Sequence, residues 1–519
     1  MDRRKFIRNA ASFVTIPLIL NGQAIQVFGG GVFSGIENAN GKILVLIQFD
    51  GGNDGLNTLI PLDMFENLVK VRPQVVLPEN KILKITEKQG LHPAMTEIQN
   101  LFTEEQIMFI QNVGYPQPNL SHFRSKEIIN SASDSKTMVS SGWLGRYLES
   151  LHPGFPENYP NTANPHPLSV TIGSSSLPTC QGEVNNMGLV MQNLNTNYQS
   201  QNDDQVFPET PYGFELKYIA QIMESTEKYL QVISEAANLS VSKSSFWPSA
   251  GSNSLADKLK IVARLIGGGL TTPIYMVNMG GFDTHSDQVE ADEKEKGQHA
   301  VLLKNFSQAV NAFLDELNLQ GKSDDVIGLT FSEFGRRIAS NSSNGTDHGE
   351  AFPMILFGNS INPVVRGENP EIPEQVKTSA NLPMKIDFRS VYASVLFHWF
   401  KLDKTQIADI LFDEFEIFPI LKSSVLNSAD IENTARLKIA AVFPNPVVQN
   451  AEVKFYSQGE KISIKLFSAE GKQLLVLFGG QTSAGKQSVQ FSRNGLPSGQ
   501  YFLVIQNNTS RNTFPVSIR

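Results

Sequence analysis

The sequence predicts an α/β domain with a largely parallel sheet flanked by helices, followed by a small C-terminal β-sandwich. Short apolar runs that are typical of buried strands alternate with helical patterns in the first four fifths of the chain. Further on, short alternating runs are separated by Gly, Asn and Ser turns, as in a sandwich. The predicted divisions are an export signal and leader at 1–40, the α/β domain at 41–425, a polar linker at 426–438 and the sandwich at 439–519.

The predicted strands of the first domain are apolar runs at 43–49, 106–113, 273–279, 326–332 and 353–358. Apolar residues recur every three or four positions in the predicted helices at 94–103, 215–237, 256–266 and 299–319. The stretch 152–212, rich in Pro, Asn, Ser and Gln, predicts a long irregular insertion. Such an insertion either frames a substrate site or only decorates the surface.

Composition excludes several classes of protein. The chain has 519 residues, a net charge of -8 and no Lys/Arg run beyond its N-terminus, which argues against nucleic acid as a partner. No stretch after the N-terminal segment is long and apolar enough to predict a transmembrane span in the mature chain. Cys180 is the only cysteine, so no intrachain disulfide forms, and packing is its simplest role.

The N-terminus resembles a twin-arginine export signal. Arg3 and Arg4 precede an apolar run of about a dozen residues, which is too short to span a bilayer. The alternative is an ordinary amphipathic first helix. Export of this kind implies a protein that folds before it crosses the membrane.

The first strand ends in a loop that suits a divalent cation. Asp50 directly follows the apolar run, and Gly51-Gly52 allows a tight turn that lets Asn53 and Asp54 face the same cavity. Two carboxylates with an amide oxygen are ligands of the kind that hard cations take. Asn and Asp beside Gly are also ordinary turn residues, so this loop alone does not decide between the two roles.

A second loop follows the strand at 273–279. Asp283 and His285 are two positions apart, so on an extended segment both side chains point to one side and can ligate one ion. The alternative is that Asp283 caps a helix that begins near Ser286, where the sequence has a strong helical pattern. Both roles are compatible with each other.

A third group follows the strand at 326–332. Glu333 and Arg336 lie on either side of Gly335, and Asp347-His348 comes after a polar loop. Carboxylate and imidazole groups are predicted to bind metal, with Arg336 holding a tetrahedral anion. The alternatives are a salt bridge from Glu333 to a neighbouring arginine and a turn at Gly345–Asp347.

Hydroxyl nucleophiles are predicted at Ser121 and, less specifically, at Thr58. Ser121 is the better candidate because His122 supplies a base and Arg124 an anion-binding group. The alternative for Ser121 is an N-cap for the helix that follows it. With His122 and Arg336, Ser121 completes the predicted catalytic residues.

Seven short motifs, in this order, resemble the bacterial domain-of-unknown-function (DUF) 1501 family over about residues 41–420. They are FDGGNDGLNTLIP, LHP, PNLSHFRS, GWLGRYL, GFDTHSDQ, SEFGRR and GTDHG. The family is grouped with the alkaline phosphatase and sulfatase superfamily. The resemblance implies an alkaline phosphatase-like fold and a one- or two-metal site for phosphate or sulfate esters. It makes Asp50 the first-strand metal ligand and Asp347 with His348 the late pair. The sulfatase nucleophile motif, Cys or Ser followed by x-Pro-x-Arg, is absent, which argues against formylglycine chemistry.

About the last 80 residues resemble the C-terminal sorting domain of the type nine secretion system. The motifs are Phe443-Pro444-Asn445-Pro446, Ile462 to Phe467, Glu470-Gly471-Lys472 and Gly499-Gln500-Tyr501. The resemblance implies the secretion machinery as a partner and passage via the periplasm to the cell surface or medium. The alternative is an accessory sandwich.

The sequence therefore predicts a secreted metal-dependent hydrolase of phosphate or sulfate esters, with polysaccharide-linked esters as one class of substrate. The predicted ion is zinc, calcium or magnesium, and its predicted ligands are Asp50, Asp54, Asp283, His285, Glu333, Asp347 and His348. The alternative is a non-catalytic surface binding or scaffold protein on the same fold.

Overall fold

The computed structural model describes residues 18–20, 23–25, 41–157, 159–174, 177–194, 210, 226–422, 438–443, 445–468, 472–493, 495–507 and 511–519. The chain forms two compact units, 1–424 and 425–519. The predicted export signal around Arg3 and Arg4 and most of the predicted linker lie outside the described residues.

The first unit is built on a nine-stranded sheet. In order across the sheet its strands are β15 (Val365–Arg366), β7 (Ile107–Gly114), β14 (Phe352–Phe357), β11 (Val326–Ser332), β3 (Ile43–Phe49), β10 (Ile274–Met279), β8 (Ser169–Ile172) and β9 (Leu189–Met191), while β16 (Ile386–Asp387) also pairs with β7. Only β14 runs against its neighbours, β7 and β11. The predicted, largely parallel sheet is confirmed.

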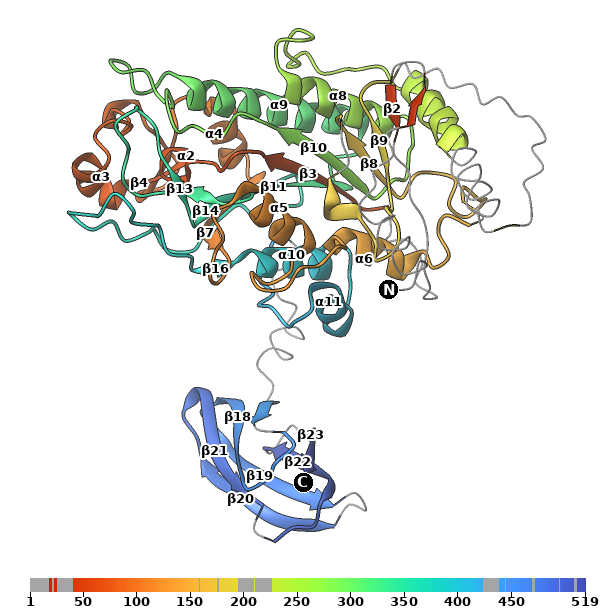
Figure 1. Ribbon diagram of the computed structural model, residues 1–519, viewed down its shortest axis with the longest axis vertical. Helices are drawn as coiled ribbons and strands as arrows, with labels where there is room; N and C mark the ends of the chain where they lie inside the picture. Colours follow the sequence, from red (N-terminus) through yellow and green to blue (C-terminus); the bar gives the residue numbers. More distant parts are fainter. Residues whose placement is uncertain are drawn as a thin grey trace. The chain divides into compact units, whose positions relative to one another are not determined.

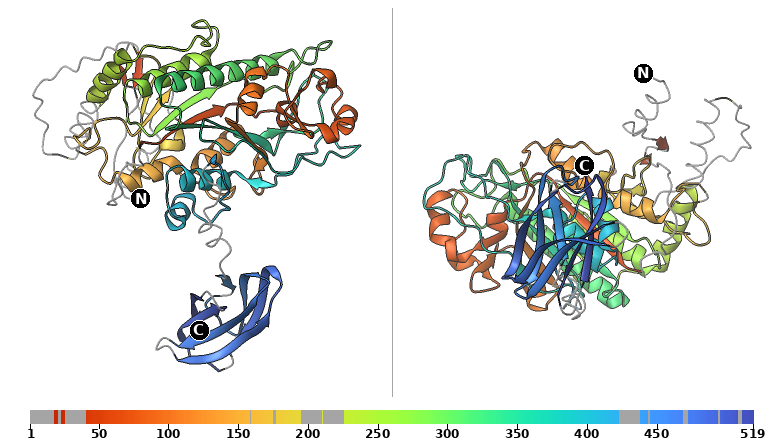
Figure 2. Two further views of the ribbon diagram at one scale, coloured as in Figure 1. Left: turned by 180° about the vertical axis from the view of Figure 1, so that it is seen from behind. Right: turned by 90° about the horizontal axis from the view of Figure 1, so that it is seen from below.

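Helices cover both faces of this sheet (Figure 1). One layer holds α4 (Thr96–Thr103), α8 (Ser254–Gly267) and α9 (Gln298–Gln320). The other holds α5 (His122–Ser131), α6 (Trp143–Leu151), α10 (Phe388–His398) and α11 (Lys404–Leu411). Figure 2 shows the same two layers from behind. The predicted α/β class with helices on both faces is therefore confirmed.

The smaller elements of this unit lie in its connections. They are β1 (Leu18–Leu20), β2 (Gln23–Ile25), α2 (Gly55–Thr58), β4 (Leu59–Pro61), η1 (Leu62–Met64), α3 (Phe65–Val71), η2 (Glu79–Lys81), β5 (Leu83–Lys84), β6 (Gln89–Leu91), η3 (Pro178–Cys180), β12 (Gly335–Arg336) and β13 (His348–Gly349).

The buried core explains why apolar runs in the sequence predicted the strands of the sheet. All seven residues of β3 are buried, as are all seven of β11, because helices cover both faces of the sheet. Caps define where helices begin: Asn253 accepts a hydrogen bond from Ala256 at the start of α8, and Asp403 forms a capping box in α11. None of the helices that the structure describes is long and apolar enough to cross a membrane.

Two expectations about local structure are wrong. The stretch 152–212 is not wholly irregular, because β8 and β9 extend the main sheet by parallel pairing. No helix begins near Ser286; residues 284–297 form a loop, and α9 starts at Gln298. The first part of that loop pairs with a second loop: Asp287 N donates to Ser343 O, and Thr346 N donates to Thr284 O.

The second unit is an antiparallel sandwich. One sheet has the order β17 (Lys438–Phe443), β18 (Asn450–Gln458), β21 (Ala484–Ser492), and the other has β20 (Gln473–Gln481), β19 (Lys461–Ser468), β22 (Gly499–Gln506), β23 (Arg511–Ile518). Alternate residues of β19 are buried, and they include Ile462, Ile464 and Leu466. They join a core with Val453 and Leu503, so the predicted small β-sandwich is confirmed.

Candidate metal centre

Three neighbouring parallel strands end at one level of the sheet. Phe49 at the end of β3 is in register with Met279 of β10 and Ser332 of β11. The carboxyl ends of parallel strands share one edge, so the loops that follow bring Asp50, Asp283 and Glu333 to that edge.

A tight turn and one buried arginine hold these loops together. Gly51 and Gly52 have φ values of +123° and +89°, as the predicted turn requires, and a Cβ on Gly51 would lie 2.2 Å from Asp283 N. The guanidinium of Arg336 donates to the carbonyl oxygens of Gly51, Gly52, Phe282 and Thr346. It also donates to Asp283 at 2.7 Å. Arg336 is completely buried and joins three loops, which differs from the anion-holding position predicted for it.

Three imidazole rings converge on the carboxylate of Asp283. The Nε2 atoms of His285 and His348 each lie 3.2 Å from its Oδ1, and Nε2 of His122 lies 3.5 Å from its Oδ2. Ligand atoms of His122, Asp283 and His348 all lie within 4.8 Å of one another. Tetrahedral ligands with bonds of ~2.0–2.1 Å are separated by about 3.3–3.4 Å, which matches these separations.

The other nitrogen of each ring is bound to an acceptor. Nδ1 of His122 lies 2.9 Å from Oε1 of the buried Glu333, and Nδ1 of His348 lies 2.9 Å from Leu120 O. Nδ1 of His285 lies 3.2 Å from Asp347. A carbonyl or an ionised carboxylate only accepts hydrogen bonds, so each Nδ1 carries the hydrogen. Such partners orient histidines that ligate metals.

This pairing leaves lone pairs facing a carboxylate. A neutral imidazole has one N–H group, so in neutral His348, whose Nδ1 donates to Leu120 O, Nε2 presents an acceptor to Asp283. Burial lowers the pKa of His348, although the acceptors Leu120 O and Asp283 favour the charged ring, and the net lowering favours the neutral ring. A ring lone pair and a carboxylate oxygen at these separations repel unless a proton or a metal cation lies between them. The donor set therefore fits a divalent ion.

Asp283 itself is held in its charged form. Burial raises its pKa, but the hydrogen bond and the positive charge of Arg336 outweigh burial, and the net pKa is lowered. Asp347 behaves alike: Asn341 and His285 bond to it, and its pKa is lowered despite burial. Both carboxylates are thus ionised at neutral pH.

Asp50 and Glu333 lie next to the group of His122, Asp283 and His348, and both form ion pairs with one lysine. Nζ of Lys126 lies 2.8 Å from Asp50 and 3.9 Å from Glu333. Asp50 also accepts from Gln48 and Asn278. Both carboxylates are therefore placed around the three-residue group and not within it.

Asp54 lies in a separate, buried group. Its Oδ2 accepts hydrogen bonds from Arg72 and from Gln288 at 2.6 Å, and both Asp54 and Arg72 are inaccessible to solvent. Burial raises its pKa, but the charge of Arg72 reverses the effect and the net pKa is lowered. The structure does not bring Asp54 to the three-residue group.

Ser121 occupies the N-cap position of α5, yet its side chain makes no cap hydrogen bond. It is exposed and precedes His122 directly. Cys180 is buried and burial raises its pKa to about 12, so it is a packing residue, as expected, and not a reactive thiolate.

Sequence reasoning missed Lys126 and Gln288. Oε1 of Gln288 accepts from Thr284 and Thr346, the residues that precede His285 and Asp347. Gln288 thus ties together the two loops that carry most of the cluster. The only indication of Gln288 in the sequence was its place in the GFDTHSDQ motif, which also contains Asp283 and His285.

Residues 42–411 match the family described as "Protein of unknown function (DUF1501)". The chain belongs to this DUF1501 family. The predicted resemblance is therefore confirmed over most of the chain. Among curated proteins, none matches it.

Solved structures similar to this DUF1501 protein include members of the alkaline phosphatase superfamily. A protein of that superfamily from Vibrio parahaemolyticus has 11% identity, a TM-score of 0.31, and coverage of 100% of this chain and 92% of its own. A sulfatase from Pseudoalteromonas sp. has 10% identity, a TM-score of 0.28, and coverage of 87% and 84%. A phosphonate monoester hydrolase from Silicibacter pomeroyi has 9% identity, a TM-score of 0.25, and coverage of 92% and 89%. Scores of this size support no inference about activity.

Residues 441–518 match the "Secretion system C-terminal sorting domain". The predicted sorting domain is confirmed, and it indicates export to the cell surface or the medium. It also implies interaction with the type nine secretion machinery.

Proposed function

We propose that this protein is a metal-dependent hydrolase of phosphate or sulfate esters, with His122, Asp283 and His348 as the ligands of a divalent ion. The observation that carries the proposal is the convergence of imidazole Nε2 atoms on one carboxylate, while each Nδ1 is held by an acceptor. A divalent ion held there would polarise an ester oxygen and the attacking hydroxyl or water.

The donor set favours zinc among the three predicted ions. Calcium and magnesium take oxygen ligands, whereas zinc binds imidazole and carboxylate together. His285, whose Nε2 also lies 3.2 Å from Asp283, would be the fourth ligand. Asp347 would orient His285 for that role.

The charge around the cluster suits an anionic ester once the ion is present. The side chains that ion pairs connect here are Asp50, Asp283, Glu333 and Asp347 on one side and Lys126, Arg336 and Arg337 on the other. These seven side chains together carry one more negative than positive charge. A divalent ion reverses the sign, so phosphate or sulfate groups are attracted only to the loaded site.

Other residues have supporting roles in this proposal. Glu333 orients His122, and Arg336 holds the loops in place. Ser121 is the proposed nucleophile because its hydroxyl makes no cap bond and it lies beside a proposed ligand. Asp50 and Lys126 form the polar surroundings, and Asp54 stabilises the fold through Arg72.

Entry into the periplasm by the twin-arginine route, before the sorting domain acts, is part of the proposal. Residues 426–438 are the proposed linker between the two units. Polysaccharide-linked esters are the proposed substrates, because a protein at the cell surface meets such polymers.

The test compares His348→Ala with His166→Ala in protein purified without chelators. His166 lies outside the cluster and its Nδ1 pairs with Thr271, so it is the matched control. We expect the control to keep one or two ions per chain and to hydrolyse 4-nitrophenyl phosphate or sulfate. His348→Ala should lose both properties.

Unchanged metal content in His348→Ala would overturn the proposed ligands. Bound metal without hydrolysis of either ester would instead support the predicted alternative, a surface binding protein. Ser121→Ala separates the nucleophile from the ligands, since it should abolish hydrolysis and leave metal content unchanged.

A further inference from the structure

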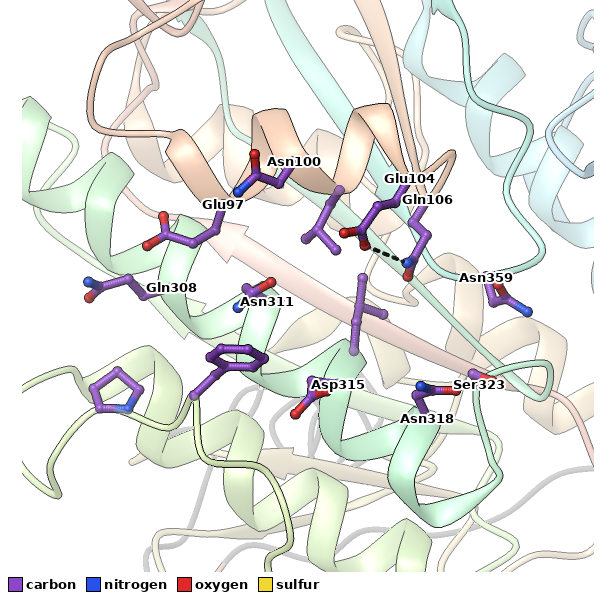
Figure 3. Close-up of a pocket in the computed structure, with 14 residues that line it drawn as sticks. Glu97, Asn100, Glu104, Gln106, Gln308, Asn311, Asp315, Asn318, Ser323 and Asn359 are labelled. Carbon is purple, nitrogen blue, oxygen red and sulfur yellow. Dashed lines mark hydrogen bonds between the residues drawn. The ribbon is translucent and has the colours of Figure 1, made fainter.

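A groove with no predicted role lies between α4 and α9. Its volume is about 740 Å³, within the range of ~300–1,000 Å³ that is typical of ligand sites. It shares no residue with the proposed metal centre. Figure 3 shows the polar side chains of both helices that line it. Its amide side chains are Asn100, Gln106, Gln308, Asn311, Asn318 and Asn359.

The charge of the groove excludes anions. Among the described residues, no lysine, arginine or histidine lines it, and the three ionisable ones that do are Glu97, Glu104 and Asp315. The phosphate and sulfate esters proposed for the metal centre would be repelled here. A ligand of this groove is therefore neutral or cationic.

The free hydrogen-bonding groups of the groove are mostly amides. Glu97 accepts a hydrogen bond from Ser307 at 2.7 Å, and Glu104 accepts one from Gln106 at 3.3 Å. The side chains of Gln308 and Asn311 make no hydrogen bond within the described part of the chain. Each amide offers both donors and an acceptor, which is what a hydroxyl group needs on both of its sides.

An aromatic side chain is fixed at the same groove. Phe246 is 57% exposed, and the segment that carries it is anchored on the buried carboxylate of Glu316 in α9. Glu316 accepts hydrogen bonds from Ser242, Lys243 N, Ser244 N and Trp247 Nε1 at 2.9–3.0 Å. Burial raises its pKa, but these bonds outweigh burial and the net pKa is lowered. An exposed phenylalanine on a well-anchored segment provides a flat apolar surface for a ligand.

We propose that this groove binds a neutral oligosaccharide. Amides supply paired donors and acceptors for sugar hydroxyls, and Phe246 supplies a surface for the apolar face of a sugar ring. A cationic peptide is the other class of ligand that the three lining carboxylates would attract, so the test below includes hexalysine. The site is independent of the metal centre and would hold a glycan chain at the protein.

The test is isothermal titration of the full chain with maltohexaose, cellohexaose, laminarihexaose and mannohexaose. We expect at least one to bind with a Kd below about 1 mM, which corresponds to about −4 kcal/mol. Phe246→Ala and Asn311→Ala should each weaken that binding at least tenfold. Val241→Ala is the matched control, since Val241 is 77% exposed, lies in the same part of the chain and does not line the groove.

Three outcomes would overturn the proposal. One is the absence of binding by all four sugars at 5 mM. Another is sugar binding that Phe246→Ala leaves unchanged, which would place the sugar elsewhere. The third is binding of hexalysine in place of the sugars. His348→Ala should bind the sugar as the wild type does, so failure of the proposed hydrolase function would not affect this result.

Discussion

The substitution Glu333→Gln tests whether Glu333 orients the proposed metal ligand His122. Oε1 of Glu333 lies 2.9 Å from Nδ1 of His122 and 2.9 Å from Gly51 N, and the side chain is fully buried. Glutamine keeps the shape and an acceptor oxygen but removes the charge that makes His122 a stronger ligand. Losing such a partner typically weakens metal affinity ~10–100-fold, or about 1.4–2.7 kcal/mol. Because one acceptor survives, we expect a loss near tenfold, and a larger one for Glu333→Ala.

Competition for Zn²⁺ with a chromophoric chelator measures this loss directly. Glu127→Gln is the matched control, because Glu127 is exposed and pairs only with Arg124 among the described residues. Thermal unfolding of the metal-free proteins should show whether Glu333→Gln also weakens the fold. If Glu333→Gln binds zinc as tightly as the control does, the argument that Glu333 orients a metal ligand is refuted.

Three further predictions concern stability. Burial lowers the pKa of His299 from the ordinary 6.5 to about 4. The contribution of neutral His299 to the free energy of unfolding is therefore complete above pH 6.5 and is lost as the pH falls toward 4, by at most about 3 kcal/mol. In urea unfolding at pH 7.5 and 4.5, His299→Gln should lose less stability between the two pH values than the wild type. Arg72→Met leaves Asp54 buried without its ion-pair partner and should cost about 3–5 kcal/mol in urea unfolding, with part recovered by adding Asp54→Asn; additive costs would contradict the pairing. Lysine in Arg336→Lys cannot make the five hydrogen bonds that Arg336 donates to acceptors in three loops, so both Tm and zinc affinity should fall, whereas a loss of activity alone would indicate direct contact with substrate.

The central strands were predictable because burial on both faces leaves an unmistakable apolar run. The predicted spans 43–49 and 326–332 coincide with β3 and β11. The short strand β8 was missed because four residues among Pro, Asn and Ser give little pattern. Its pairing with β10 comes from tertiary structure, which overrides local propensity.

The site was predictable only to the level of which loops carry it. Strand ends indicated Asp283 and Glu333, but the sequence could not tell a residue that faces the ion from one that orients its neighbour. Glu333 contacts His122 from a separate segment, 211 positions away, so only the folded chain reveals that role. No helix forms at Ser286 for a related reason. The backbone N–H groups of Asp287 and Val289 donate to Ser343 O and Asn344 O, which lie in a loop that is distant in the sequence.

Anomalous diffraction at the zinc edge, on crystals of the full chain grown with Zn²⁺, would locate the proposed ion. We expect a peak about 2.0–2.2 Å from Nε2 of His122, Nε2 of His348 and an oxygen of Asp283. A peak at Asp54, or none within reach of these three side chains, would contradict it.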